Sequence, residues 1–400
     1  MLLKMSAQKK ICSFVFLLTI ILMFNAEENE EDGFCYKKDG VSECVSLQNF
    51  NLTRLDGGQV GDITEIFLQD GKTLQMETLN TRPLVFEIPD FLSDEECEHF
   101  INVANNIGMK ASYTERQTTQ KGISLMDINS DKKLSLAEMK LTIENGFDIY
   151  LEDEDVIEMY KLMKIDTNND NFITQAEMKD FSPQKMANYL SDFLKEHPEK
   201  HSRYSKQAWL YPDQSTDEVF NLVQKRVSEV VQLPMSLIQL SDFQVVNYGI
   251  NGHYNAHLDS SHIRKEQQCC DRGRYSKCRI CRYMTILFYL NDVDDGGETA
   301  FPFANKDSIN HTNSHLNRVQ HLYKKCHEVD LRVPAEKRKA IIWYNHFIDE
   351  STGWMGDIDE YTLHGGCPVK AGEKWIANFW IKTNDEKSID LDKIKNLLMK

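Results

Sequence analysis

The sequence predicts an α+β protein with a double-stranded β-helix (jelly-roll) core, flanking helices and an inserted all-α pair of helix–loop–helix units. Short apolar runs, several with period-two alternation, recur beyond Gln239, and turn residues such as those at 294–297 and 365–366 separate them. This pattern is typical of a double-sheet barrel. The runs lie at 243–246, 284–290, 340–343 and 375–381. Residues 115–185 have a different, acidic character and form the predicted insertion.

The N-terminus carries a targeting segment, predicted at residues 1–30. Lysines precede the uncharged apolar run 11–24, and the acidic stretch 27–32 follows it. The run is short for a bilayer span and long for a signal-peptide core, so a signal-anchor and a cleaved signal peptide both stay open. Positive charge before the run favours a cytosolic N-terminus, and in either case the rest of the chain enters the secretory pathway.

Residues 31–82 are interpreted as an acidic linker followed by short strands.

Two helices are expected to pack on the outer face of the barrel. Ser93 and Glu96 then form a capping box, a signal that marks the start of a helix. A second capping box at 215–218 precedes valines at helical spacing.

The ten cysteines fit an oxidising compartment, where disulfides form and persist. Cys35 and Cys44 lie close together in an acidic, loop-like segment and are expected to pair. The others beyond the leader are Cys97, Cys269, Cys270, Cys278, Cys281, Cys326 and Cys367. We favour disulfides of undetermined connectivity over zinc, which the C-x-x-C spacing at 278–281 leaves as the alternative. Sequons beginning at residues 51 and 310 are compatible with glycosylation.

Two acidic loops carry the ligand spacing of EF-hands. Calcium takes six to eight oxygens, and an EF-hand supplies them from positions 1, 3, 5, 7 and 12 of a twelve-residue loop. The predicted ligands are Asp127, Asn129, Asp131, Lys133 and Glu138 in the first loop, and Asp166, Asn168, Asp170, Phe172 and Glu177 in the second. Position 6, normally Gly, is Lys132 and then Asn171, so we expect tighter binding at the second loop, because Asn tolerates a positive φ better. Leu134 and Ile173 are expected to pair across a short strand.

The composition limits the partners. Hydrophobic residues make up 41% of the 400-residue chain, which is enough for a globular core. The formal net charge of −16 argues against nucleic acid as a partner, since that contact needs a basic surface. Part of the acidity comes from the carboxylates of the two loops.

A metal centre is predicted from His257, Asp259 and His364. Residues i and i+2 of a strand point to one face, so His257 and Asp259 can hold one ion. A later histidine completes the two-histidine, one-carboxylate set of non-haem Fe(II) oxygenases. Lys374 follows, directly before the apolar Trp375 and Ile376, and a buried amine there needs an anion such as the distal carboxylate of 2-oxoglutarate. We treat His253, His262, His321 and His346 as structural or exposed.

The motifs around these residues resemble those of the prolyl 4-hydroxylases. They are 244–259, 282–291, 296–302, 343–345 and 364–374, followed by Trp380. The EF-hand insertion and the leader narrow the resemblance to the type that is anchored in the endoplasmic reticulum membrane. It implies a dioxygenase core in residues 83–114 and 186–385, interrupted by the EF-hand pair at 115–185 and followed by a tail at 386–400.

The resemblance also implies roles and cofactors. The residues carried over are His257, Asp259 and His364 as iron ligands, Lys374, Tyr248 and Thr299 as contacts of the cosubstrate, and Trp380 near the substrate face. The implied cofactors are Fe(II), 2-oxoglutarate and L-ascorbate, with Ca(II) in the insertion. The implied reaction hydroxylates C4 of a peptidyl proline and releases succinate and CO2.

The resemblance leaves partners and regulation as expectations. A proline-containing protein is the expected substrate. A hypoxia-inducible factor α-like substrate, and with it oxygen sensing, is one candidate, and modulation of the activity by calcium is a further expectation. The expected location is the endoplasmic reticulum membrane, as a single-pass type II protein with a lumenal catalytic domain, or the lumen or exterior after signal cleavage. A homodimer stays open. The alternatives are a collagen-type prolyl hydroxylase and, in another class, a lumenal calcium sensor with an inactive oxygenase fold.

Overall fold

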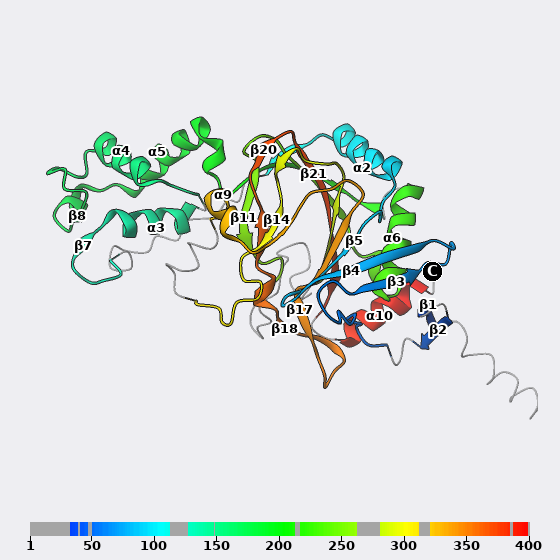
Figure 1. The fold of residues 1–400 in the computed structure, drawn as a ribbon. Helices are drawn as coiled ribbons and strands as arrows, with labels where there is room; N and C mark the ends of the chain where they lie inside the picture. The colour runs from blue at the N-terminus through cyan, green and yellow to red at the C-terminus, as the bar shows by residue number, and fades with distance from the viewer. Residues whose placement is uncertain are drawn as a thin grey trace, which may run out of the picture.

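The fold is described from a computed structural model of the chain (Figure 1). It describes residues 33–38, 41–46, 50–112, 127–147, 149–212, 217–261, 281–311, 321–384 and 387–398. The predicted leader, Cys12, His262 and the cysteines at 269, 270 and 278 lie outside the described residues, as does Thr312 of the second sequon. Within the described part, every helix is too short or too polar to cross a bilayer.

A 13-stranded antiparallel sheet forms the body of the molecule, which is consistent with the predicted jelly-roll core. Its strands are β3 (Ile63–Phe67), β4 (Thr73–Thr81), β5 (Leu84–Ile88), β6 (Lys110–Ser112), β9 (Arg203–Leu210), β10 (Phe243–Tyr248), β11 (His253–His257), β12 (Cys281–Tyr289), β14 (Thr299–Phe301), β15 (Leu331–Val333), β16 (Ala340–Tyr344), β19 (His364–Gly366) and β21 (Lys374–Thr383). Their order is β15-β14-β19-β11-β9-β10-β21-β12-β16-β5-β4-β3, and β6 pairs with β9. This order brings residues from distant parts of the sequence to one sheet face.

Four two-stranded pairs complete the β structure. They are β1 (Gly33–Lys38) with β2 (Val41–Ser46), β7 (Lys133–Leu134) with β8 (Ile173–Thr174), β13 (Asp295–Gly296) with β20 (Val369–Ala371), and β17 (His346–Asp349) with β18 (Trp354–Ile358). Cys35 is the register partner of Cys44 in the first pair. The predicted pairing of Leu134 with Ile173 is confirmed in the second.

The turn predicted at Gly365–Gly366 is wrong, because both residues belong to β19, which pairs with β11 and β14. A Cβ atom on Gly365 would lie 2.5 Å from the Tyr254 carbonyl oxygen and 2.6 Å from Cδ1 of Leu322. The glycine therefore permits a close approach between β19 and its neighbours rather than a change of chain direction.

Two helices cover one face of the sheet, as predicted. Helix α2 (Asp94–Ile107) begins with the predicted capping box of Ser93 and Glu96. Helix α6 (Glu218–Val231) has Asp217 as its N-cap, and the Asp217 side chain accepts from the main-chain N–H groups of residues 219 and 220. The predicted cap, Ser215, lies outside the described residues. The short α7 (Met235–Ile238) follows, and the predicted tail contains helix α10 (Lys387–Leu398). Apolar side chains of α2 and α6 share one buried cluster with the sheet.

The segment 127–196 forms a separate helical unit beside the large sheet (Figure 1). It contains α3 (Leu136–Phe147), α4 (Asp153–Met163), the 3-10 turn η3 (Glu177–Asp180) and α5 (Pro183–Glu196) around a buried cluster of its own. The short helix α9 (Leu322–Lys325) meets this unit, and the turn η6 (Cys326–Glu328) follows α9. Two further 3-10 turns are η4 (Pro198–Lys200) and η7 (Glu360–Thr362).

A disulfide joins Cys326 of η6 to Cys367, just beyond β19, with the two Cα atoms 5.7 Å apart. Cys281 is also disulfide-bonded, which agrees with the preference for disulfides over zinc. Cys97 is a free, buried thiol.

Candidate active site

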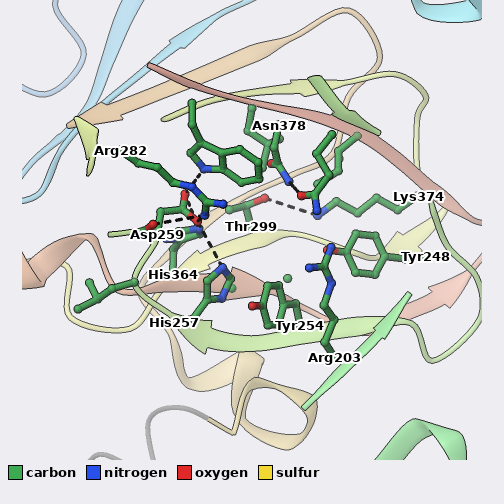
Figure 2. A pocket seen from close by; sticks show the side chains of 17 residues that line it. Arg203, Tyr248, Tyr254, His257, Asp259, Arg282, Thr299, His364, Lys374 and Asn378 are labelled. Atoms are coloured by element: carbon green, nitrogen blue, oxygen red, sulfur yellow. Dashed lines mark hydrogen bonds and ion pairs between the residues drawn. The ribbon is translucent and has the colours of Figure 1, made fainter. Parts of the chain in front are cut away.

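A cavity of about 220 Å³ lies on the inner face of the sheet (Figure 2). Strands β9, β10, β11, β12, β19 and β21 each contribute side chains to its wall. Alternate residues of a strand point to the same face, so Lys374, Ile376, Asn378 and Trp380 of β21 all line it. Polar groups occupy both ends, and the wall between them includes apolar side chains.

His257, Asp259 and His364 converge at one end of the cavity, as predicted. The register pairs His257 of β11 with His364 of β19, and one donor atom from each of the three residues lies within 4.8 Å of the others. Each imidazole has Nε2 3.6 Å from a carboxylate oxygen of Asp259. Each Nδ1 lies 2.9 Å from a main-chain carbonyl oxygen, which can only accept, so Nδ1 carries the proton. Both Nε2 lone pairs therefore face the carboxylate and are free to bind a metal.

Electrostatics keep this end in the ligating state. Burial disfavours the charge of Asp259, but His364, His257 and Arg282 outweigh it and hold the pKa of Asp259 well below its usual range. Burial lowers the pKa of His364 to about 4, against the pull of Asp259. Near neutral pH the set consists of a carboxylate and an unprotonated His364, which is the form a metal requires.

Lys374 lies at the other end of the cavity and is 2% exposed. Its Nζ is 3.5 Å from Oγ1 of Thr299 and faces the rings of Tyr248 and Tyr289 at 5.7 and 5.5 Å. Burial lowers the pKa of Lys374 to about 7, with Glu298 opposing the shift. Burial also raises the pKa of Tyr248 to about 12, so its hydroxyl stays protonated. The three residues predicted to hold the cosubstrate, Tyr248, Thr299 and Lys374, therefore meet in one place.

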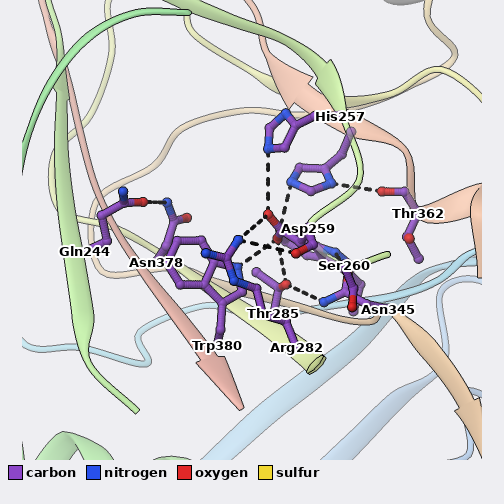
Figure 3. A network of polar contacts seen from close by, with 12 residues as sticks. Gln244, His257, Asp259, Ser260, Arg282, Thr285, Asn345, Thr362, Asn378 and Trp380 are labelled. Carbon is purple, nitrogen blue, oxygen red and sulfur yellow. Dashed lines mark hydrogen bonds and ion pairs between the residues drawn. The ribbon is translucent and has the colours of Figure 1, made fainter. Parts of the chain in front are cut away.

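Trp380 lines the cavity as predicted, and it also contacts one predicted metal ligand directly. Its indole N–H donates to Oδ2 of Asp259 at 2.9 Å (Figure 3). The guanidinium carbon of Arg282 stacks 3.8 Å from the centre of the Trp380 ring. Trp209 packs on the same indole, with ring centroids 5.8 Å apart.

The sequence patterns did not identify Arg203, Tyr254 and the carboxamides of this cavity as site residues. Tyr254 stacks on the ring of His257 at 3.7 Å, and Arg203 lies 4.7 Å from the Tyr254 ring centre. Gln244 accepts from Asn378 and donates to Gln207, so a row of three amides crosses the sheet. Polar residues at inward positions hide the alternation that marks a strand, which is why no pattern pointed to them.

The two acidic loops share one geometry outside the cavity. Asp127 accepts from the main-chain N–H groups of Asp131 and Lys132, and the equivalent Asp166 accepts from those of residues 170 and 171. Glu138 accepts from the main-chain N–H of Ile128 at 2.9 Å, so it folds back across its loop, and residue 177 does the same toward residue 167. Position 6 has positive φ in both loops, 67° at Lys132 and 63° at the Asn of the second loop.

Three other histidines, His253, His346 and His321, have structural contacts or lie at a contact between units. Both ring nitrogens of His253 contact main-chain carbonyl oxygens, of Asn251 and His201. His346 contacts the Ser260 hydroxyl at 2.6 Å. His321 lies 3.7 Å from a carboxylate oxygen of the helical unit.

Comparison with known proteins places this geometry in a family. Residues 243–382 match the model of the 2OG-Fe(II) oxygenase superfamily. The transmembrane prolyl 4-hydroxylase of Homo sapiens is 32% identical over 93% of this chain and 77% of the human protein, and that of Mus musculus is 34% identical over the same shares. A viral collagen prolyl hydroxylase from Paramecium bursaria Chlorella virus-1, solved as a 2-oxoglutarate complex, aligns with 20% identity and a TM-score of 0.36 over 75% of this chain and 96% of that one.

Proposed function

This chain belongs to the prolyl 4-hydroxylases of the 2-oxoglutarate–Fe(II) oxygenase superfamily, and we propose that His257, Asp259 and His364 hold its iron. The observation that carries this assignment is the convergence of two Nε2 lone pairs and one carboxylate at the end of the cavity. This donor set suits Fe(II), which accepts imidazole and carboxylate ligands and keeps positions open.

Lys374 is the proposed anchor of 2-oxoglutarate. A buried amine is costly without an anion, and the distal carboxylate supplies one, with the Thr299 hydroxyl and the Tyr248 ring beside the amine. When bound, Fe(II) and 2-oxoglutarate activate O2 to hydroxylate C4 of a peptidyl proline, with succinate and CO2 as co-products. The chain's own residues position the reactants: Lys374 fixes the cosubstrate, and the indoles of Trp380 and Trp209 offer an apolar surface on which a proline ring can pack.

The proposed calcium sites are the two acidic loops, each an EF-hand, with residues 115–185 as the insertion and residues 83–114 and 186–385 as the catalytic domain. The positive φ at position 6 and the folded-back glutamate in both loops support this. The helical unit also touches the catalytic part: Glu152 pairs with Lys324, and the Tyr150 and His321 rings lie 5.0 Å apart. Calcium modulation through this contact is part of the proposal.

The cellular setting of the proposal rests on the similarity to transmembrane prolyl 4-hydroxylases. It comprises an endoplasmic reticulum membrane anchor in the N-terminal segment, a lumenal catalytic domain, ascorbate as the reductant and a homodimer. A hypoxia-inducible factor α-like protein is the proposed substrate, and a collagen-type sequence is the alternative to be tested beside it.

The test is succinate formation by the purified chain with Fe(II), ascorbate, 2-oxoglutarate and proline-containing peptides of both types. We expect peptides to stimulate turnover by the unsubstituted protein. Turnover should disappear in Asp259→Ala and in Lys374→Ala, while both variants stay folded. Turnover that survives in Asp259→Ala would refute the iron assignment. Runs with calcium and with a chelator show whether the helical unit modulates the rate.

A further inference from the structure

A chain of buried hydrogen bonds leads from Trp343 to the carboxylate of Asp259 (Figure 3 shows the part from Asn345 onward). The indole N–H of Trp343 donates to Oδ1 of Asn345 at 3.0 Å. Nδ2 of Asn345 donates to Oγ1 of Thr285 at 2.8 Å, and the Thr285 hydroxyl donates to Oδ2 of Asp259 at 2.7 Å. Trp343, Asn345 and Thr285 are each at most 1% exposed, so water cannot replace these contacts.

The donor at the start fixes the direction of every bond in this chain. An indole N–H can only donate, so Asn345 must turn its oxygen toward Trp343 and its NH2 toward Thr285. The Thr285 oxygen then receives a hydrogen, and its own hydrogen is left for Asp259. The side-chain orientation of Asn345 therefore follows from donor counting rather than from an arbitrary amide choice.

The sheet register places this series of hydrogen bonds between two indoles of the site. Thr285 on β12 is the register partner of Trp343 on β16 and of Trp380 on β21. Oδ2 of Asp259 thus accepts from Trp380 directly and from Thr285. The ring of Trp343 also meets that of His364 edge-on, with centroids 4.6 Å apart. One indole thereby contacts one proposed iron ligand and orients another.

We propose that Trp343, Asn345 and Thr285 are positioning residues that fix the orientation of the Asp259 carboxylate and thereby present Oδ1 to the metal. The inference rests on the proposed iron site and deepens it. Two donors hold Oδ2 at 2.7 and 2.9 Å, and Oδ2 also lies 3.6 Å from Nε2 of His364. Among the described residues, Oδ1 has only longer contacts, 3.6 Å to Nε2 of His257 and 3.7 Å to a guanidinium nitrogen of Arg282, so it is the oxygen that a metal can take. Hydrogen-bond partners behind a ligand orient it and set its basicity, and their loss typically lowers metal affinity roughly 10- to 100-fold.

The experiment compares Thr285→Val, which keeps the side-chain shape, with Thr285→Ser, which keeps the hydroxyl. Fe(II) dissociation constants are measured anaerobically by titrating the metal-free full chain, with Co(II) as a redox-stable second probe. Thr285→Val should bind Fe(II) on the order of 10-fold more weakly and release more succinate per hydroxyproline formed. Thr285→Ser should stay close to the unsubstituted protein.

Thr78→Val is the matched control, because Thr78 is also buried and its hydroxyl donates to a main-chain carbonyl oxygen, that of Gly57. Trp343→Phe is the second test, since it removes the indole N–H and leaves a ring beside His364; weaker Fe(II) binding is expected there too. Two results would overturn this inference but not the proposed iron site. One is equal Fe(II) affinity in Thr285→Val and Thr78→Val, and the other is an equal loss of affinity in Thr285→Ser and Thr285→Val. Fe(II) binding that is insensitive to Asp259→Ala would overturn the proposed site with it.

Discussion

Nζ of Lys374 lies 3.5 Å from Oγ1 of Thr299, at the end of the cavity opposite Asp259 (Figure 2). The Thr299 oxygen already accepts from the Tyr289 hydroxyl at 2.8 Å. The contact to Lys374 is longer than an ordinary hydrogen bond, so the ammonium group is free to turn to a stronger acceptor. A carboxylate entering the cavity is such an acceptor, and the next two predictions depend on it.

Lys374→Met should raise the dissociation constant of 2-oxoglutarate on the order of 100-fold, because losing one partner of a buried charge pair costs about 2–5 kcal/mol. Fe(II) affinity should change little, since the metal end lies across the cavity. Separate calorimetric titrations with 2-oxoglutarate and, anaerobically, with Fe(II) measure the two constants, and Lys374→Arg is the control that keeps the charge. A Met variant with native 2-oxoglutarate affinity would refute the anchor.

The affinity for 2-oxoglutarate should fall as pH rises above 7. Burial lowers the pKa of Lys374 to about 7 in the free protein, so the amine loses its charge above that pH, while the ligand requires the charged form. Each unit above pH 7 should weaken binding up to about tenfold, and below pH 7 the effect should level off. Proton uptake on binding, measured in two buffers of different ionisation enthalpy, checks the same linkage. A flat profile from pH 6 to 9 would contradict it.

Arg226→Met should destabilise the fold by roughly 2–4 kcal/mol, because it leaves the half-buried Glu96 carboxylate without its partner. Both guanidinium nitrogens of Arg226 contact Glu96 at 2.8 Å, and one also donates to the Phe91 carbonyl oxygen. Glu96 also completes the capping box of α2, so the Arg226–Glu96 ion pair connects α6 to the start of α2. Urea denaturation measures the loss; Arg338→Met, at a more exposed ion pair, should cost less than 1 kcal/mol.

Lys132→Gly should tighten calcium binding at the first loop. Lys132 holds φ at 67°, a conformation that costs a non-glycine residue about 1–2 kcal/mol, so glycine should improve affinity roughly five- to thirtyfold. Asn171→Gly should gain less, because Asn tolerates this region. Calcium titration with Glu138→Gln and Glu177→Gln assigns each constant to its loop. An equal gain in both glycine variants would argue against a weaker first loop.

Glu144→Gln should remove a slope in the pH dependence of stability. Burial raises the pKa of Glu144 to about 7, so the folded state binds a proton that the unfolded state releases near pH 4.5. Stability from this group is present at low pH and is lost as pH rises from about 4.5 to 7, by up to about 3 kcal/mol. Denaturation at pH 5 and pH 8, in chelator, compares the two proteins. The same slope in Glu144→Gln would assign it to another group.

Local chemistry alone was enough to predict several parts of this protein. The capping box at Ser93 depends on residues three apart, and the spacing of the acidic loops depends on twelve consecutive residues. His257 and Asp259 were expected to share a face because a strand has a two-residue period. The apolar runs correctly predicted the strands β10, β12, β16 and β21. Each signal is contained within a short segment, so no knowledge of the fold was needed to read it.

Tertiary structure decided what lies between distant segments. No sequence pattern assigned Arg203 or Gln244 to the cavity, and only the neighbouring positions of β9, β10 and β21 bring such side chains to its wall. Gly365 was predicted to lie in a turn, but it lies in β19, where its close packing against Tyr254 leaves no room for a side chain. The chain from Trp343 to Asp259 depends on the register of three strands. Register is set by burial across the whole sheet, and no local pattern contains it.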